Sequence, residues 1–100
     1  MGSAIIWTTT ALHQLDEIYT HILNDSGSVR MADNVVTTLY ESTDILKTYP
    51  EIYSLDAMKT DNDGTIRAYE KYHYRISYRI AKAQIYILRV RHTSRAPLPY

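Results

Sequence analysis

Cysteine and phenylalanine are absent from this sequence, and glycine and proline occur only three times each. Without cysteine the chain has neither disulfide bonds nor thiolate metal sites, which suits a reducing compartment. No apolar run approaches the roughly 20 residues that a membrane-spanning helix needs, and the N-terminus lacks the basic and apolar regions of a signal peptide. We therefore expect a cytoplasmic protein that makes no membrane contact.

Sequence signatures of several enzyme classes are also missing. The chain has no Gly-rich phosphate loop, no HExxH zinc motif and no nucleophile elbow. His13 and His21 are the histidines that share an expected helix, and they lie beside its apolar side, where solvent-facing positions are favoured over metal ligation. We expect neither a metal nor a cofactor.

Charge is distributed unevenly along the chain, although the net charge is zero. Residues 1–64 carry three basic and ten acidic side chains, whereas residues 65–100 carry eight basic side chains and only Glu70 as an acid. Six of the eight are arginines, whose planar guanidinium groups suit phosphate and stack on bases. This asymmetry indicates a polyanionic partner for the basic part. The alternative is a solvated basic face that balances acidic helices.

The hydrophobic pattern predicts a strand, two amphipathic helices and three further strands. Apolar residues recur at steps of three and four in two stretches, which is typical of helices, and β-branched residues and tyrosines dominate the C-terminal part, which favours strands. Threonines 8–10 offer an N-cap, and Pro50 requires the second helix to have ended. The expected elements are a strand at 3–7, helices at 11–23 and 29–46, a loop at 49–59, strands at 65–72, 74–81 and 84–92, and a tail at 93–100.

This order predicts an α+β fold in one domain, residues 1–100, because the helices are segregated from a run of strands. The helical hairpin is expected to pack on one face of a small, mainly antiparallel sheet. We expect the inward side chains to be Tyr74, Ile76, Tyr78 and Ile80 on one strand and Tyr86, Leu88 and Val90 on the next. Arg75, Ser77 and Arg79, with Arg89 and Arg91, are then expected on the opposite face, where like charges repel unless an anion lies between them.

These residue types suit the cleavage of a phosphodiester by an attacking 2′-hydroxyl. Arginines can stabilise the pentavalent oxyanion, and His92 can act as acid or base near neutral pH. Tyr72, Tyr86 and Tyr100 are able to stack on a base. The alternative for His92 is a strand-end residue bonded to a carbonyl group, and for Tyr72 and Tyr86 packing in the core is favoured.

Four phrases of the sequence together resemble the RelE/ParE superfamily of bacterial toxins. They are W-x3-A-x3-L-x2-I from Trp7, TYPEIY from residue 48, R-A-Y-E-x3-Y-R-I-S-Y-R-I from Arg67, and ILRVRHTSRAP from Ile87. The similarity covers residues 4–97, and the family's fold has the same order of elements. It implies the toxin of a type II toxin–antitoxin, or plasmid stabilisation, module.

The resemblance implies one of two activities. As a metal-independent mRNA endonuclease on the ribosome, Arg75 and Arg91 would stabilise the scissile phosphate, and His92 would be the acid or base. The binding of flanking phosphates would fall to Arg67, Arg79, Arg89 and Arg95, with Tyr100 as a distant candidate for the tyrosine of some nucleases. The lysine pair of some nucleases is missing, and the ending VRHTSR is closer to the ParE branch. As a ParE-like inhibitor of DNA gyrase, the same basic surface would bind protein without chemistry of its own.

The resemblance also implies an antitoxin with an acidic, partly disordered C-terminal segment that folds on binding. A different hypothesis is a non-toxic module on the same fold that binds RNA or a protein partner.

Overall fold

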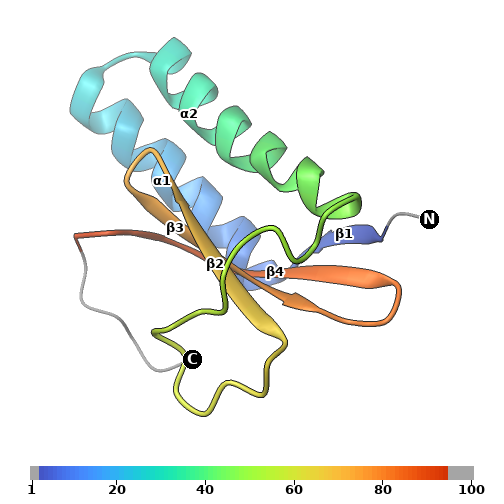
Figure 1. The fold of residues 1–100 in the computed structure, drawn as a ribbon. Coiled ribbons are helices and arrows are strands. Elements are labelled where there is room, and N and C mark those ends of the chain that lie inside the picture. Colours follow the sequence, from blue (N-terminus) through green and yellow to red (C-terminus); the bar gives the residue numbers. More distant parts are fainter. Residues whose placement is uncertain (1–2, 95–100) are drawn as a thin grey trace.

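The computed structural model describes residues 3–94 and confirms the predicted α+β order. The elements are β1 (Ala4–Trp7), α1 (Thr9–Ser26), α2 (Val29–Glu41), the 3₁₀ helix η1 (Ser42–Lys47), β2 (Ile66–Lys71), β3 (Tyr74–Ile80) and β4 (Gln84–His92). Figure 1 shows the hairpin of α1 and α2 on one side of the sheet. The predicted tail lies largely outside the described residues.

The sheet has the order β1-β4-β3-β2. β4 pairs with β1 in parallel and with β3 in antiparallel fashion, and β3 pairs with β2 in antiparallel fashion. The helical hairpin therefore lies, in the chain, between β1 at one edge of the sheet and β2 at the other edge. Because β1 ends at Trp7, opposite Ile87, no strand among residues 3–94 lies on the outer side of the C-terminal half of β4.

The helices begin and end at the residues that their chemistry favours. The Thr8 hydroxyl accepts the Ala11 N–H at 3.2 Å and caps α1, and the Ser28 hydroxyl accepts the Met31 N–H at 3.1 Å and caps α2. Gly27 ends α1 at φ 67°, with its N–H donating to the Leu23 carbonyl at 2.8 Å. The second helix tightens into η1 before Pro50, so the predicted stretch 29–46 is helical but not α-helical throughout.

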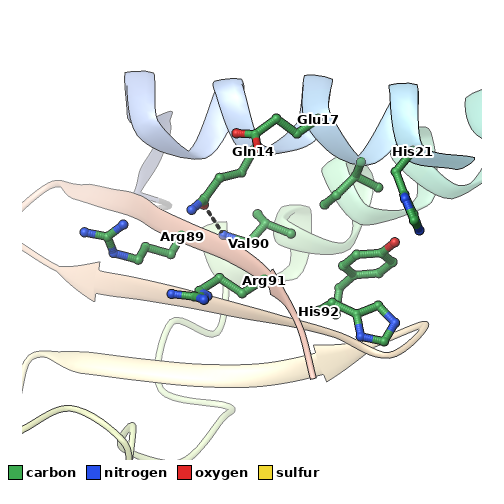
Figure 2. Close-up of a pocket in the computed structure, with 9 residues that line it drawn as sticks. Gln14, Glu17, His21, Arg89, Val90, Arg91 and His92 are labelled. Atoms are coloured by element: carbon green, nitrogen blue, oxygen red, sulfur yellow. Dashed lines mark hydrogen bonds between the residues drawn. The ribbon is translucent and has the colours of Figure 1, made fainter. Parts of the chain in front are cut away.

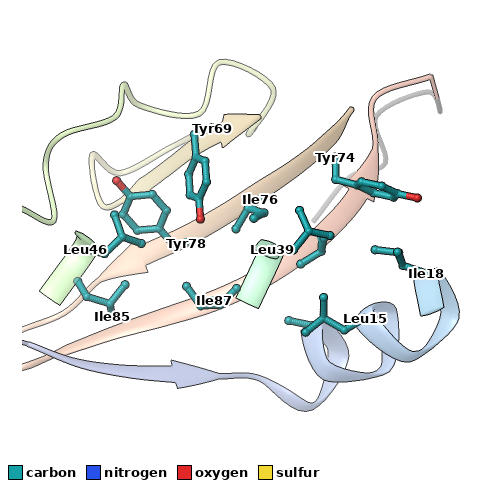
Figure 3. Packing of buried hydrophobic residues seen from close by; sticks show 12 residues of the cluster. Leu15, Ile18, Leu39, Leu46, Tyr69, Tyr74, Ile76, Tyr78, Ile85 and Ile87 are labelled. Carbon is teal, nitrogen blue, oxygen red and sulfur yellow. The ribbon is translucent and has the colours of Figure 1, made fainter. Parts of the chain in front are cut away.

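The core lies between the hairpin and the sheet (Figure 3). Core residues from both layers are at most 5% exposed, for example Leu15 and Leu39 of the hairpin and Ile76 and Ile87 of the sheet. Buried tyrosine hydroxyls find partners at the edge of this core: Tyr78 donates to the Pro50 carbonyl at 2.7 Å, and Tyr69 lies 2.7 Å from the Ser42 hydroxyl.

A β-bulge changes the facing of β4 and corrects part of the sequence prediction. Ser77 pairs with Arg89, but Tyr78 pairs with Ile87, so Leu88 is an extra residue. One extra residue reverses the alternation of side chains. Ile85 and Ile87 are therefore buried in the core, and the prediction that Tyr86 and Leu88 point inward was wrong. Beyond the bulge, Val90 is buried as predicted.

The turn between β2 and β3 is formed by two residues with positive φ, Tyr72 (50°) and His73 (65°). Positive φ at both positions is the type I′ geometry, which matches the twist of a hairpin. Tyr72 is 55% exposed, so the favoured interpretation of core packing for this residue was wrong.

The sheet face opposite the helices is partly covered. Residues 54–56, in the segment before β2, form backbone hydrogen bonds with β2. The Asp56 N–H donates to the Ile66 carbonyl at 2.9 Å, and the Ala68 N–H donates to the Ser54 carbonyl at 3.2 Å. Ile66 and Ser77 are each only 2% exposed on this face. At these two residues the face opposite the helices is therefore not open to solvent.

Candidate interaction site on the basic face

The register of β3 and β4 brings the predicted arginines together. Arg75 lies opposite Arg91, and Ser77 lies opposite Arg89. Arg79 follows Ser77 by two positions on β3, so it lies on the same face. All four arginines project from the face opposite the helices, because Tyr74, Ile76 and Tyr78 between them on β3 are buried against the hairpin. The register therefore places these arginines on two neighbouring strands.

Arg75 is held by carboxylates of its own chain. Its Nη2 lies 2.7 Å from Oδ1 of Asp56, which is fully buried, and its Nη1 lies 3.6 Å from Oε2 of Glu70, which is half exposed. Asp56 also accepts the Met58 N–H at 2.9 Å. The charge of Arg75 is therefore largely compensated, whereas Arg91 makes no ion pair with any carboxylate in residues 3–94.

Sequence reasoning missed Asp56, because it lies in a segment without periodicity, nineteen residues before its partner. Which carboxylate meets Arg75 depends on the pairing of residues 54–56 with β2.

Arg67 is separated from the other predicted site residues. It pairs with Tyr78, so its side chain leaves the sheet on the helix side, and its Nη1 donates to the Tyr53 carbonyl at 2.7 Å. This hydrogen bond ties Arg67 to the loop that follows η1, where the guanidinium group lies near the Tyr78 hydroxyl. The structure does not bring Arg67 together with Arg75 and Arg91.

His92 ends β4 with its ring against Tyr74, at 5.2 Å between ring centroids in an edge-to-face arrangement. Its Nδ1 accepts the Ser94 N–H at 3.1 Å and lies 2.7 Å from the Ser94 hydroxyl. This arrangement differs from the carbonyl bond that the alternative expected. With Nδ1 accepting this bond, the other ring nitrogen, Nε2, is left to contact a ligand.

A cavity of about 210 Å³ lies between α1 and the unpaired half of β4 (Figure 2). Gln14 reaches from α1 to β4, where its Oε1 accepts the Val90 N–H at 2.7 Å and so replaces a missing strand partner. Figure 2 shows Glu17 and His21 on the α1 side, with Arg91 and His92 on the β4 side. The three α1 residues were not predicted as site residues, because their proximity to β4 depends on how the helix crosses the sheet.

His13 and His21 are exposed, as expected. Residues 3–94 contain no group of three or more His, Cys, Asp or Glu side chains placed to hold a metal ion. Arg95 and Tyr100 lie outside the described residues. Within the described part of the chain, no helix has the length and hydropathy required to cross a membrane.

Solved structures share this fold of a strand, a helical hairpin and three strands. A chain of the chromosomal ParDE toxin–antitoxin system from P. aeruginosa is 21% identical, with a TM-score of 0.74 over 92% of this chain and 97% of that chain. A chain of the RelBE2 toxin–antitoxin complex from Mycobacterium tuberculosis is also 21% identical, with a TM-score of 0.58 over 92% of this chain and 99% of that chain.

The family assignment rests on the sequence itself. Residues 5–97 match the family described as ParE toxin of type II toxin-antitoxin system, parDE. No curated protein sequence matches the chain. This chain belongs to the ParE toxin family, as the resemblance to the RelE/ParE superfamily predicted.

Proposed function

We propose that this toxin acts by binding DNA gyrase through its basic face, without chemistry of its own. The observation that carries this proposal is the ion pair of Arg75 with the buried Asp56. The nuclease hypothesis needs Arg75 and Arg91 together on a scissile phosphate, but Arg75 already shares its charge with two carboxylates. Arg67, a second phosphate ligand in that hypothesis, leaves the sheet on the helix side. A surface that binds a protein does not need these arginines to meet at one phosphate group.

A supercoiling assay tests this proposal. Purified toxin is added to gyrase and relaxed plasmid, and we expect supercoiling to be inhibited. The variant Arg91→Gln, which removes a charge of the basic face, should weaken inhibition. The control Arg30→Gln removes one charge from the exposed surface of α2 and should leave inhibition unchanged. Unchanged supercoiling with the wild-type toxin would remove the proposal.

A second candidate function is mRNA cleavage on the ribosome, and the position of His92 favours it. Arg91 precedes His92 at the end of β4, and both side chains line the cavity beside α1. Ribosomes that carry a defined mRNA should then yield cut products with the wild-type toxin and far fewer with His92→Gln. Intact mRNA with the wild-type toxin would exclude the enzyme.

The proposed partner is a cognate antitoxin with an acidic C-terminal segment, in a cytoplasmic toxin–antitoxin module of the plasmid-stabilising kind. Support comes from the arginines of β3 and β4 and from the unpaired half of β4, which leaves strand edge for an extended peptide. A neighbouring reading frame should encode a small protein with an acidic C-terminal half. Harmless expression of the chain without any antitoxin would instead favour a non-toxic binding module.

A further inference from the structure

An apolar groove of about 610 Å³ opens where η1 ends and the chain turns toward β2. We call it the η1 groove, and the residues that line it are Ile45, Thr48, Tyr49, Pro50, Glu51 and Ile52. Figure 1 shows this segment, in green, between the end of α2 and β2. Ile45, Tyr49 and Ile52 are 40%, 61% and 50% exposed. Large apolar side chains that are exposed together mark an interaction surface, whereas single ones do not.

Hydrogen bonds on both sides of Pro50 hold the η1 groove in shape. The Tyr49 N–H donates to the Ile45 carbonyl at 2.9 Å, and the Ile52 N–H donates to the Tyr49 carbonyl at 3.2 Å. The Pro50 carbonyl accepts the hydroxyl of the buried Tyr78 at 2.7 Å, which ties this turn to β3. The apolar side chains are therefore exposed on an anchored backbone, and the groove is formed before a ligand arrives.

The geometry of η1 places a charged row beside the apolar one. In a 3₁₀ helix, residues three positions apart lie above one another. Ile45 and Thr48 form the row that lines the groove. Glu41, Asp44 and Lys47 form a neighbouring row, in which Lys47 pairs with Asp44 at 3.4 Å. Because that pair is neutral, Glu41 gives this row a net negative charge.

A further carboxylate lies in the η1 groove itself. Glu51 lines the groove, is exposed, and makes no ion pair with a cation in residues 3–94. Arg67, the cation that reaches this loop from β2, donates instead to the Tyr53 carbonyl at 2.7 Å. The groove therefore combines apolar walls with acidic borders, the reverse of the arginine-rich face of β3 and β4.

We propose that the η1 groove binds an apolar segment of a partner protein that carries a lysine or an arginine beside its apolar side chains. The apolar side chains of this segment cover Ile45, Tyr49 and Ile52, and its cation pairs with Glu51. An acidic segment is repelled, so the antitoxin segment expected at the basic face does not fit here.

The η1 groove goes beyond the proposed gyrase binding, because it is a different surface with the opposite charge. The hydroxyl of Tyr78, a residue buried against the hairpin, reaches Pro50, so the groove lies on the helix side of the sheet. The arginines of β3 and β4 project from the other face. The test of the groove uses no gyrase, so the two proposals fail independently.

The test is a titration of the full-length ¹⁵N-labelled chain with three capped pentapeptides, followed by amide NMR shifts. Each peptide contains the sequence Ala-Leu-Pro-Leu, followed by arginine, glutamine or glutamate. We expect saturable shifts at the amides of Ile45, Tyr49 and Ile52. The arginine peptide should bind about threefold more tightly than the glutamine peptide, and the glutamate peptide should bind most weakly.

Two variants separate the apolar contribution from the electrostatic one. Ile52→Thr removes apolar surface from the groove and should weaken the binding of all three peptides about fivefold. Glu51→Gln should abolish the preference for the arginine peptide over the glutamine peptide. Val29→Thr is the matched control, because Val29 is 54% exposed and begins α2, at the end of that helix remote from η1. It should leave peptide binding unchanged.

Circular dichroism checks that each variant folds, and Glu51→Gln keeps the proposal testable if Ile52→Thr does not fold. Shifts that do not saturate with any of the three peptides would overturn the proposal. Equal weakening by Val29→Thr, or a preference for the arginine peptide that persists in Glu51→Gln, would overturn it as well.

Discussion

The guanidinium group of Arg75 lies 2.7 Å from the buried carboxylate of Asp56, and this pair joins the loop before β2 to the central strand β3. The pair also explains how Arg75 tolerates its position opposite Arg91. Two guanidinium groups on neighbouring strands repel, and the carboxylate of Asp56 offsets that repulsion from within the same face.

Removing the Asp56 charge should destabilise the fold. In Asp56→Asn the partly buried Arg75 loses its counter-ion, and we expect the free energy of unfolding to fall by about 2–3 kcal/mol. Urea denaturation followed by circular dichroism measures this change. Glu70→Gln is the matched control, because Glu70 is 56% exposed and lies 3.6 Å from Arg75, and it should cost less than about 1 kcal/mol. Equal losses in the two variants would contradict the structural role of Asp56.

Stability should decline at alkaline pH because buried tyrosines resist ionisation. Burial raises the pKa of Tyr78 to about 12, and it raises the pKa of Tyr69 as well. In the unfolded chain these groups ionise near pH 10, so their contribution is complete below pH 10 and is lost as pH rises from about 10 through 12. The slope should reach about 1.4 kcal/mol per pH unit for each tyrosine.

Denaturation at pH 9, 10 and 11, with tyrosinate absorbance recorded in parallel, measures this dependence. Tyr78→Phe removes one ionising group and its bond to the Pro50 carbonyl. This variant should be less stable at pH 9 but show a shallower decline between pH 10 and 11. An unchanged slope in the variant would show that Tyr78 is not the group responsible.

Gly27 should be the best residue at the end of α1. It adopts φ 67°, a conformation that strains side chains with a Cβ atom, and no heavy atom lies within 4 Å of the position that a Cβ would take. Gly27→Ala should therefore lower the free energy of unfolding by about 1 kcal/mol through backbone strain alone. Thermal or urea denaturation checks this, and Gly27→Asn should lose less, since asparagine tolerates this conformation.

In the turn between β2 and β3, by contrast, a substitution should stabilise the fold. Tyr72 and His73 hold positive φ without being glycine or asparagine. Replacing them with Asn-Gly, the preferred pair for a type I′ turn, should raise the free energy of unfolding by about 1 kcal/mol. Urea denaturation measures the gain, and the reversed order Gly-Asn should gain less. A loss of stability would mean that the contact between the rings of His73 and His92 outweighs the backbone strain.

Local chemistry made much of the fold predictable. The helix ends at Gly27 and before Pro50, and the three C-terminal strands, follow from residues close together in the chain, because caps, turns and side-chain alternation act over a few positions. The facing of β3 was predicted correctly for the same reason. The facing of Tyr86 and Leu88 on β4 was not, since a bulge at Leu88 is decided by how β4 fits β3 and the core, not by its own alternation.

The sequence by itself determined that this chain carries a cluster of arginines on two adjacent strands, and residue spacing was enough because alternation on a strand is fixed by covalent geometry. Only the tertiary structure decided which of these charges are compensated. Asp56 reaches Arg75, and Arg67 turns to the helix side, through contacts between segments that are distant in the chain. Such contacts depend on strand pairing and loop packing, which no local pattern encodes.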